Sequence, residues 1–150
     1  STIKADTIIC ETIGNDCIDF SSSVGKIEEI KSINVKDKVI SLGEVSNLNI
    51  KLLNIKSSEI GVVSKDSSVL LISNFDYLDV KLPIVSFIKK PQFNSSIIKI
   101  FEVSPISIDK YLISPESIVI VRDRRIPANQ SSKAIKDTIY GNQYGVKTNR

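Results

Sequence analysis

The chain has 150 residues, of which 41% are hydrophobic and 25% charged, an ordinary balance for one globular domain with a sizeable core. No apolar run reaches the roughly 18 residues of a membrane-spanning helix, and the absence of His excludes metal–His, Ser–His and Cys–His chemistry within these residues. The net charge of +3 is concentrated near the C-terminus, so the rest of the chain lacks the basic surface typical of nucleic-acid-binding proteins. We therefore expect no nucleic acid and no membrane among the partners, and no cofactor.

The first segment, from Ser1 onward, reads as a strand and does not begin with Met. This start predicts a fragment or a processed product of a longer protein, and the segment shows no signal peptide. Cys10 and Cys17 follow seven residues apart, without the partner Cys or His that a zinc site requires. A disulfide between them stays open, but we expect free thiols, buried or half-buried.

A short strand then recurs along the chain at a constant spacing of 22 residues. Its first inward-facing position is always aliphatic. This column reads Ile18, Ile40, Val62 and Ile84, and Ile106 continues it. The next position tolerates polar residues, and the one after it is again inward-facing, as the two-residue period of a strand requires. These outward and inward columns read Asp19, Ser41, Val63 and Val85, and then Phe20, Leu42, Ser64 and Ser86.

A second strand in each repeat has the same spacing. One of its columns holds Ile33, Ile55 and Tyr77, and another holds Glu28, Ile50 and Ile72, of which Glu28 fits poorly. Short polar corners at 21–23, 43–47 and 65–68 separate the strands.

Short strands at a fixed period with polar corners predict an all-β fold, a right-handed parallel β-helix with coils of about 22 residues. Equivalent residues would stack about 4.8 Å apart, so that inward columns become continuous aliphatic ladders. A leucine-rich repeat has a similar period, but its Leu-x-x-Leu-x-Leu signature is not found. A β-sandwich would also give short strands, but nothing in it requires five aliphatic residues at one spacing.

The organisation that follows has two parts. We expect β-helix coils over residues 1–121, as a piece of a longer solenoid, with a longer loop at 91–96 and a degenerate last coil whose corners are Pro105 and Pro115. Residues 122–150 carry a net charge of +5 and read as a basic, partly disordered tail, in which 131–137 can start a short helix capped by Ser. Uncapped coil ends would allow self-association.

The segments 14–21, 37–44 and 60–68 resemble the right-handed β-helix repeat region of the pectate-lyase-like superfamily. They are similar to repeat regions of bacterial surface and secreted proteins that also carry CotH-like or lamin-tail domains. The resemblance implies an extracellular or cell-surface location, with polysaccharide or other domains of the same protein as partners. Residues 14–18 also resemble the Gly-Asp-Asp-Cys-Ile stretch of polygalacturonases, although Asn15 departs from it and the catalytic His of that family has no counterpart.

Two acidic pairs are the candidates for chemistry. Glycoside hydrolysis needs clustered carboxylates, and Asp16 and Asp19 are the catalytic candidates for it. In a regular strand they would point to opposite faces, so we expect Asp16 to bond the turn backbone and Asp19 to face solvent.

Glu44 and Asp66 are 22 residues apart and would stack on adjacent coils, so they are the metal-ligand candidates, for Ca²⁺. Pectate-lyase-type elimination also needs a base, and Lys65 is adjacent. We expect both carboxylates to be solvated corner residues and Lys65 to have an ordinary pKa, because nothing in the corner sequence would desolvate it.

A further polar column reads Asn15, Asp37, Glu59 and Lys81, in which Glu59 and Lys81 can form an ion pair. From the strong repeat and the lack of an assembled catalytic set, we expect a noncatalytic structural or binding segment of a larger bacterial surface or secreted protein. The alternative is a fragment of a carbohydrate-active β-helix enzyme, a polysaccharide lyase or glycoside hydrolase.

Overall fold

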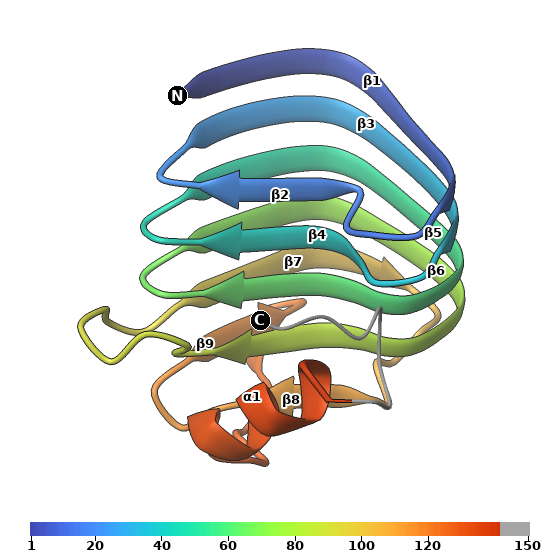
Figure 1. The fold of residues 1–150 in the computed structure, drawn as a ribbon. Coiled ribbons are helices and arrows are strands. Elements are labelled where there is room, and N and C mark those ends of the chain that lie inside the picture. The colour runs from blue at the N-terminus through green and yellow to red at the C-terminus, as the bar shows by residue number, and fades with distance from the viewer. Residues whose placement is uncertain (142–150) are drawn as a thin grey trace.

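The repeated strands stack into a parallel β-solenoid of about five turns in the computed structural model, which describes residues 1–141 (Figure 1). The fold class expected from the 22-residue period is confirmed. Over these residues the elements are β1 (Thr2–Ile13), β2 (Ile18–Ser21), β3 (Val24–Val35), β4 (Lys38–Gly43), β5 (Asn47–Lys65), β6 (Val69–Phe87), β7 (Ile97–Ser104), β8 (Tyr111–Ile113), β9 (Ile118–Val121), β10 (Arg124–Arg125) and α1 (Ser132–Ile139). All strand pairs are parallel except that of β9 with β10.

The coils form one continuous sheet that bends at a corner into two faces around the core, which we call the long sheet and the short sheet. The long sheet runs β1, β3, the N-terminal half of β5, the N-terminal half of β6, β7 and β9. The short sheet runs β2, β4, the C-terminal halves of β5 and β6, and β8. Between them the chain turns through residues in the left-handed region, one per coil at the corner formed by Thr12, Asn34, Ser57 and Asp79. Asn and Asp, which occupy two of these four positions, tolerate that conformation better than most residues.

The first inward column is the spine of the short sheet. Ile18 pairs with Ile40, Ile40 with Val62 and Val62 with Ile84, and all four are buried. The expected continuation at Ile106 is wrong. Tyr111 pairs with Ile84 instead, and Ile106 is 86% exposed. The loop between β6 and β7 is longer than the earlier corners, so the next coil no longer follows at a spacing of 22 residues.

The long sheet also corrects the predicted columns. Ile55 pairs with Tyr77 as expected, but on its other side it pairs with Ser32, and Ile33 is 40% exposed. Likewise Ile27, and not Glu28, stacks on Ile50. The cause is the length of the corners. Three residues connect β4 to β5, whereas two connect β2 to β3, so the pairing of β3 with β5 is shifted by one residue from the 22-residue spacing.

The serines of these corners are buried groups that bind the backbone. Ser46 Oγ accepts the N–H of Ser23 at 3.2 Å, and Ser68 Oγ accepts the N–H of Ser46 at 3.1 Å. The serine of each coil therefore accepts a hydrogen bond from a backbone N–H of the preceding coil. Without it, that N–H would be unpaired at the corner.

Cys10 and Cys17 form a disulfide, with Cα atoms 6.1 Å apart, that links β1 to the segment before β2. The expectation of free thiols is therefore wrong. Cys10 lies near the C-terminal end of β1 and Cys17 immediately precedes β2, so the turn between the two strands brings the cysteines together.

Helix α1 covers part of the outer face of the short sheet (Figure 1). The expected Ser cap is confirmed, because Ser131 Oγ accepts the N–H of Ala134 at 3.1 Å. Ile135 and Ile139 pack in one cluster with Val63 and Val85. These valines point outward from the sheet, so α1 is what buries the apolar part of the outward column.

Residues 122–141 of the expected tail thus contain β10 and α1, and the remainder of that tail, 142–150, lies outside the described residues. The domain boundary at 121 stays a prediction. No helix found in residues 1–141 is both long and apolar enough to cross a membrane.

Candidate functional site

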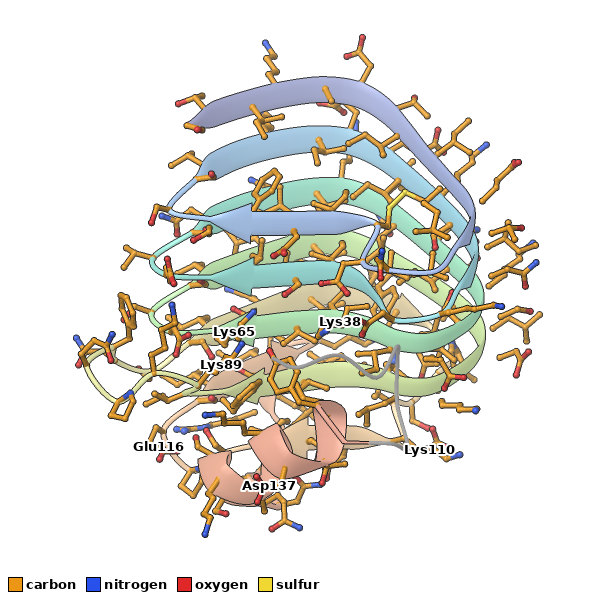
Figure 2. The ribbon with its side chains drawn as sticks, in the orientation of Figure 1. Lys38, Lys65, Lys89, Lys110, Glu116 and Asp137 are labelled. Carbon is orange, nitrogen blue, oxygen red and sulfur yellow. A yellow bond between two sulfur atoms is a disulfide. The ribbon has the colours of Figure 1, made fainter. Side chains whose placement is uncertain are left out.

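A hollow lined by several charged side chains lies on the outer face of the short sheet, next to the C-terminal end of α1. We call it the lysine pocket. It has a volume of about 320 Å³, and the described residues that line it are Asn15, Asp16, Asp19, Lys38, Ser41, Lys65, Lys89 and Tyr140. Figure 2 shows Lys38, Lys65 and Lys89 close together on this face, above α1.

Lys38 is a buried charge held by two carboxylates. Its side chain is 1% exposed, and its Nζ lies 2.9 Å from Asp37 Oδ1 and 3.4 Å from Asp16 Oδ1. Asp16 Oδ1 also accepts the backbone N–H of Lys38 at 3.1 Å. Burial raises the pKa of Asp16, and the charge of Lys38 acts against that rise. The wall of the pocket is therefore a satisfied ionic network.

Lys65 is buried without such a carboxylate. The residue is 8% exposed, and its side chain crosses the open space over Gly43, where a Cβ atom would lie 3.3 Å from Lys65 Cε. Its Nζ donates to Ser41 Oγ at 2.9 Å, and in residues 1–141 it forms no ion pair. Burial lowers the pKa of Lys65 to about 8. The expectation of an ordinary pKa is wrong, because the side chain is buried against the neighbouring coil, at Ser41 and Gly43.

Lys89 completes the cationic side of the pocket. Its Nζ lies 4.3 Å from the centroid of the Tyr140 ring, and the Nζ of Lys38 lies 5.1 Å from the same centroid. Burial is also the main cause that lowers the pKa of Lys89, and the charges of Lys38 and Lys90 add to it. The ring of Tyr140, the C-cap residue of α1, is thus in cation–π contact with two ammonium groups.

The catalytic candidates Asp16 and Asp19 both line the lysine pocket. The expectation that they face opposite sides is wrong, because Asp16 lies before β2 begins and the alternation of that strand does not extend to it. The backbone bond expected for Asp16 is present, although it goes to Lys38 of the next coil. Whether either carboxylate is catalytic stays a prediction.

The metal-ligand candidates Glu44 and Asp66 sit at the same corner of successive coils, and each has its own partners. Glu44 accepts from Ser21 Oγ at 2.7 Å and forms an ion pair with Lys90, and these contacts lower the pKa of Glu44. Asp66 is fully buried, so it is not the solvated residue that we expected. Its Oδ1 accepts the N–H groups of Lys89 and Lys90, at 2.8 and 2.9 Å, and positions the loop after β6.

One oxygen of Asp66, Oδ2, is buried and has no hydrogen-bond partner among residues 1–141. Across residues 1–141, no group of three or more His, Cys, Asp or Glu side chains comes together as a set of metal ligands. The metal role of Glu44 and Asp66 therefore stays a prediction.

A second hollow, of about 370 Å³, lies at the corner that contains Asn34 and Ser57. Two of its charged residues form an ion pair, with Lys81 Nζ 3.0 Å from Glu59 Oε1, as the polar column predicted. Such an exposed pair contributes about 0–1 kcal/mol.

Sequence reasoning missed three members of the lysine pocket. Lys38 and Lys89 are not among the residues that the sequence singled out, and Tyr140 falls within the segment expected to be a tail. One signal could have found them: the outward column changes from polar at Ser41 to apolar at Val63 and Val85, which indicates that something covers the lower coils.

Comparison with protein-family models, with curated proteins and with solved structures found no match to the chain. The parallel β-solenoid is supported by the structure itself, and the pectate-lyase-like and CotH-like resemblances stay predictions.

Proposed function

We propose that the chain is a noncatalytic structural or binding segment of a larger bacterial surface or secreted protein. The observation that carries the proposal is the state of the charges in the lysine pocket. Asp16, which hydrolysis would need as an acid or a base, is held by the buried Lys38 at 3.4 Å and by its N–H at 3.1 Å. A carboxylate that is already held by an ammonium group and a backbone N–H serves as a fixed part of the pocket wall. It is poorly placed to exchange a proton with a substrate.

The location is supported by the Cys10–Cys17 disulfide. Disulfides persist in oxidising compartments and are rare in reducing ones, which favours a secreted or surface-exposed protein.

As ligand we propose a polysaccharide, or another domain of the same protein. The pocket volume of about 320 Å³ is at the lower end of small-molecule sites, which span roughly 300–1,000 Å³. Its lining of carboxylates, ammonium groups, an amide and a hydroxyl suits a ligand with many hydroxyl groups.

The test compares binding with turnover. The chain is titrated with a panel of neutral and acidic polysaccharides by calorimetry, and each mixture is followed for new reducing ends and, with millimolar Ca²⁺, for the ultraviolet absorbance of unsaturated products. We expect binding without turnover, and loss of binding in Asn15→Trp, which fills the entrance of the pocket from an exposed position. Asn49→Trp, exposed on the long sheet, is the matched control. Turnover would overturn the noncatalytic proposal.

The second candidate is a fragment of a carbohydrate-active enzyme. One observation favours it: Asp16 and Asp19 share a pocket with Lys65, whose pKa of about 8 would allow it to act as a base near neutral pH. This candidate predicts turnover that disappears in Asp19→Asn and in Lys65→Met.

A further inference from the structure

We propose that the lysine pocket binds an oxyanion group, such as a carboxylate, sulfate or phosphate, through the ammonium groups of Lys65 and Lys89. The inference rests on the proposed binding role of this pocket and adds the chemical class of its ligand.

The first step is the unmet hydrogen-bonding capacity of Lys65. An ammonium group has three donors, and in residues 1–141 only Ser41 Oγ, at 2.9 Å, accepts one of them. Buried charges are normally paired with an opposite charge. Lys65 is 8% exposed and has none within ion-pair distance in the part of the chain that the structure describes. An acceptor with a negative charge is the partner that this environment lacks.

The second step is the division of charges within the pocket. Asp16 and Asp37 are both engaged by Lys38, and Glu44 at the neighbouring corner is engaged by Lys90. Asp19 also lines the pocket, and its charge partly offsets the lowering of the Lys65 pKa, but it is not within ion-pair distance of either lysine. Within residues 1–141, Lys65 and Lys89 are therefore two neighbouring cations without an ion pair. An oxyanion has several acceptor oxygens, so one group can accept from both ammonium groups and remove their mutual repulsion.

The third step is the link to protonation. Burial lowers the pKa of both Lys65 and Lys89, and the charge of Lys89 adds to the lowering at Lys65. A bound anion would favour the protonated forms, so binding should be accompanied by proton uptake at pH values near 8. The charged or titratable groups that face the two lysines are Asp16, Asp19, Lys38, Asp66, Lys90, Lys136 and Tyr140.

The test is calorimetric titration of the chain, at low ionic strength, with sodium phosphate, sulfate and acetate, and with sodium chloride and glucose as controls. We expect at least one oxyanion to bind while chloride and glucose do not, and the three oxyanion arms identify which group is preferred. Lys65→Met and Lys89→Met should each weaken binding about tenfold or more, as expected for loss of a hydrogen bond from a charged donor. Lys51→Met, an exposed lysine of the long sheet, should bind as the original chain does.

The pH dependence gives a second readout. Binding should weaken between pH 7 and pH 9.5 as Lys65 loses its proton. Lys65→Arg keeps its charge over this range, and its binding should not fall through pH 8. If Lys65→Met fails to fold by circular dichroism, Lys89→Met and Lys65→Arg decide the question.

Two results would overturn the inference: no oxyanion binding by the folded chain, or binding that both lysine variants leave unchanged. In either case, polysaccharide binding that Asn15→Trp abolishes would leave the proposed binding function intact. If the folded chain binds neither oxyanions nor polysaccharides, both proposals are rejected.

Discussion

Single residues of the short sheet have very different surroundings although they follow one pattern. Ser41, Val63 and Val85 occupy equivalent outward positions, yet Ser41 accepts a hydrogen bond from Lys65 and the valines pack under α1. The lysine pocket arises where the cover provided by α1 ends. A charged side chain at that border is desolvated by its neighbours and cannot reach water freely.

We expect Lys65→Met to stabilise the chain at pH 7. A pKa lowered from 10.5 to about 8 means that burial disfavours the protonated form by about 3 kcal/mol. Methionine keeps the apolar stem over Gly43 and removes the charge, so the free energy of unfolding should rise by about 1–3 kcal/mol. Urea denaturation followed by circular dichroism measures this change.

The pH dependence of that change has a defined sign. Because the folded pKa of Lys65 lies below the unfolded value, the folded chain binds fewer protons between about pH 8 and 10.5, and its stability rises with pH there. The advantage of Lys65→Met should therefore shrink from pH 7 to pH 10. A difference that stays constant, or a variant less stable at pH 7, would contradict this account, whereas Lys51→Met should stay within about 0.5 kcal/mol of the original chain.

Val62→Asp should abolish cooperative folding. Val62 is fully buried between Ile40 and Ile84, and an unpaired buried carboxylate costs several kcal/mol. The matched control is Val45→Asp, because Val45 is 54% exposed and has a φ of 62°, which Asp tolerates better than Val. A thermal melt of Val62→Asp close to that of the control would argue against burial of the ladder.

At the scale of elements, α1 is held to the solenoid by a small apolar face. Ile135 and Ile139 are its buried residues, and they contact the cluster that contains Val63, Val85 and Phe87. The helix has eight residues, too short to be stable in isolation, so its structure depends on this contact.

We expect Ile135→Ala to lower the free energy of unfolding by about 2–4 kcal/mol, because it opens a cavity under α1. Lys133→Ala, at an exposed position of the same helix, should change stability by less than about 0.5 kcal/mol. Denaturant unfolding of the two variants checks the difference, and equal effects would mean that α1 does not dock as described.

The disulfide stabilises the first coil. Cys10 and Cys17 close a loop with a sequence separation of seven, for which the chain-entropy model gives about 2–3 kcal/mol. The double variant Cys10→Ala with Cys17→Ala should lose about that much stability. Thiol titration of the unfolded chain should detect no thiol before reduction, and two reactive thiols without reductant would show that the bond does not form.

At the scale of the whole molecule, the coils are stabilised by one another, because each ladder residue is buried by the coils above and below it. The long sheet ends at β1, whose one partner in residues 1–141 is β3. Ile9 of β1 is 62% exposed. An open strand edge of this kind pairs readily with another chain.

We therefore expect the 150-residue chain to self-associate, with a mass that rises with concentration in light scattering. Ile9→Lys should shift the equilibrium toward monomer, because a charge at a sheet edge disfavours pairing. Leu78→Lys replaces an apolar residue that is 67% exposed on β6, away from that edge, and should leave the association unchanged. A monodisperse monomer at high concentration would reject this prediction.

The sequence by itself determined the fold, because the information for a coil is repeated in every coil. Ile18, Ile40, Val62 and Ile84 have one spacing since each must face the same core in register with the next. The short helix was also predictable, since Ser131 caps it through a bond to a residue only three positions away. The predicted columns were wrong where a corner or loop changed length, as before β5 and after β6. A count of residues does not show on which side of a corner an extra residue lies, so it could not predict which residues pair beyond that corner.

The tertiary structure alone decided the chemistry of the site. Lys65 looks like a solvated corner residue in sequence, and its burial depends on the preceding coil, where its side chain lies against Gly43 and Ser41. The Cys10–Cys17 disulfide and the shared pocket of Asp16 and Asp19 depend in the same way on how the chain turns at the corner before β2. Periodicity is local and can be read from the chain, whereas desolvation and charge pairing depend on which distant segments meet, and only the packed molecule determines that.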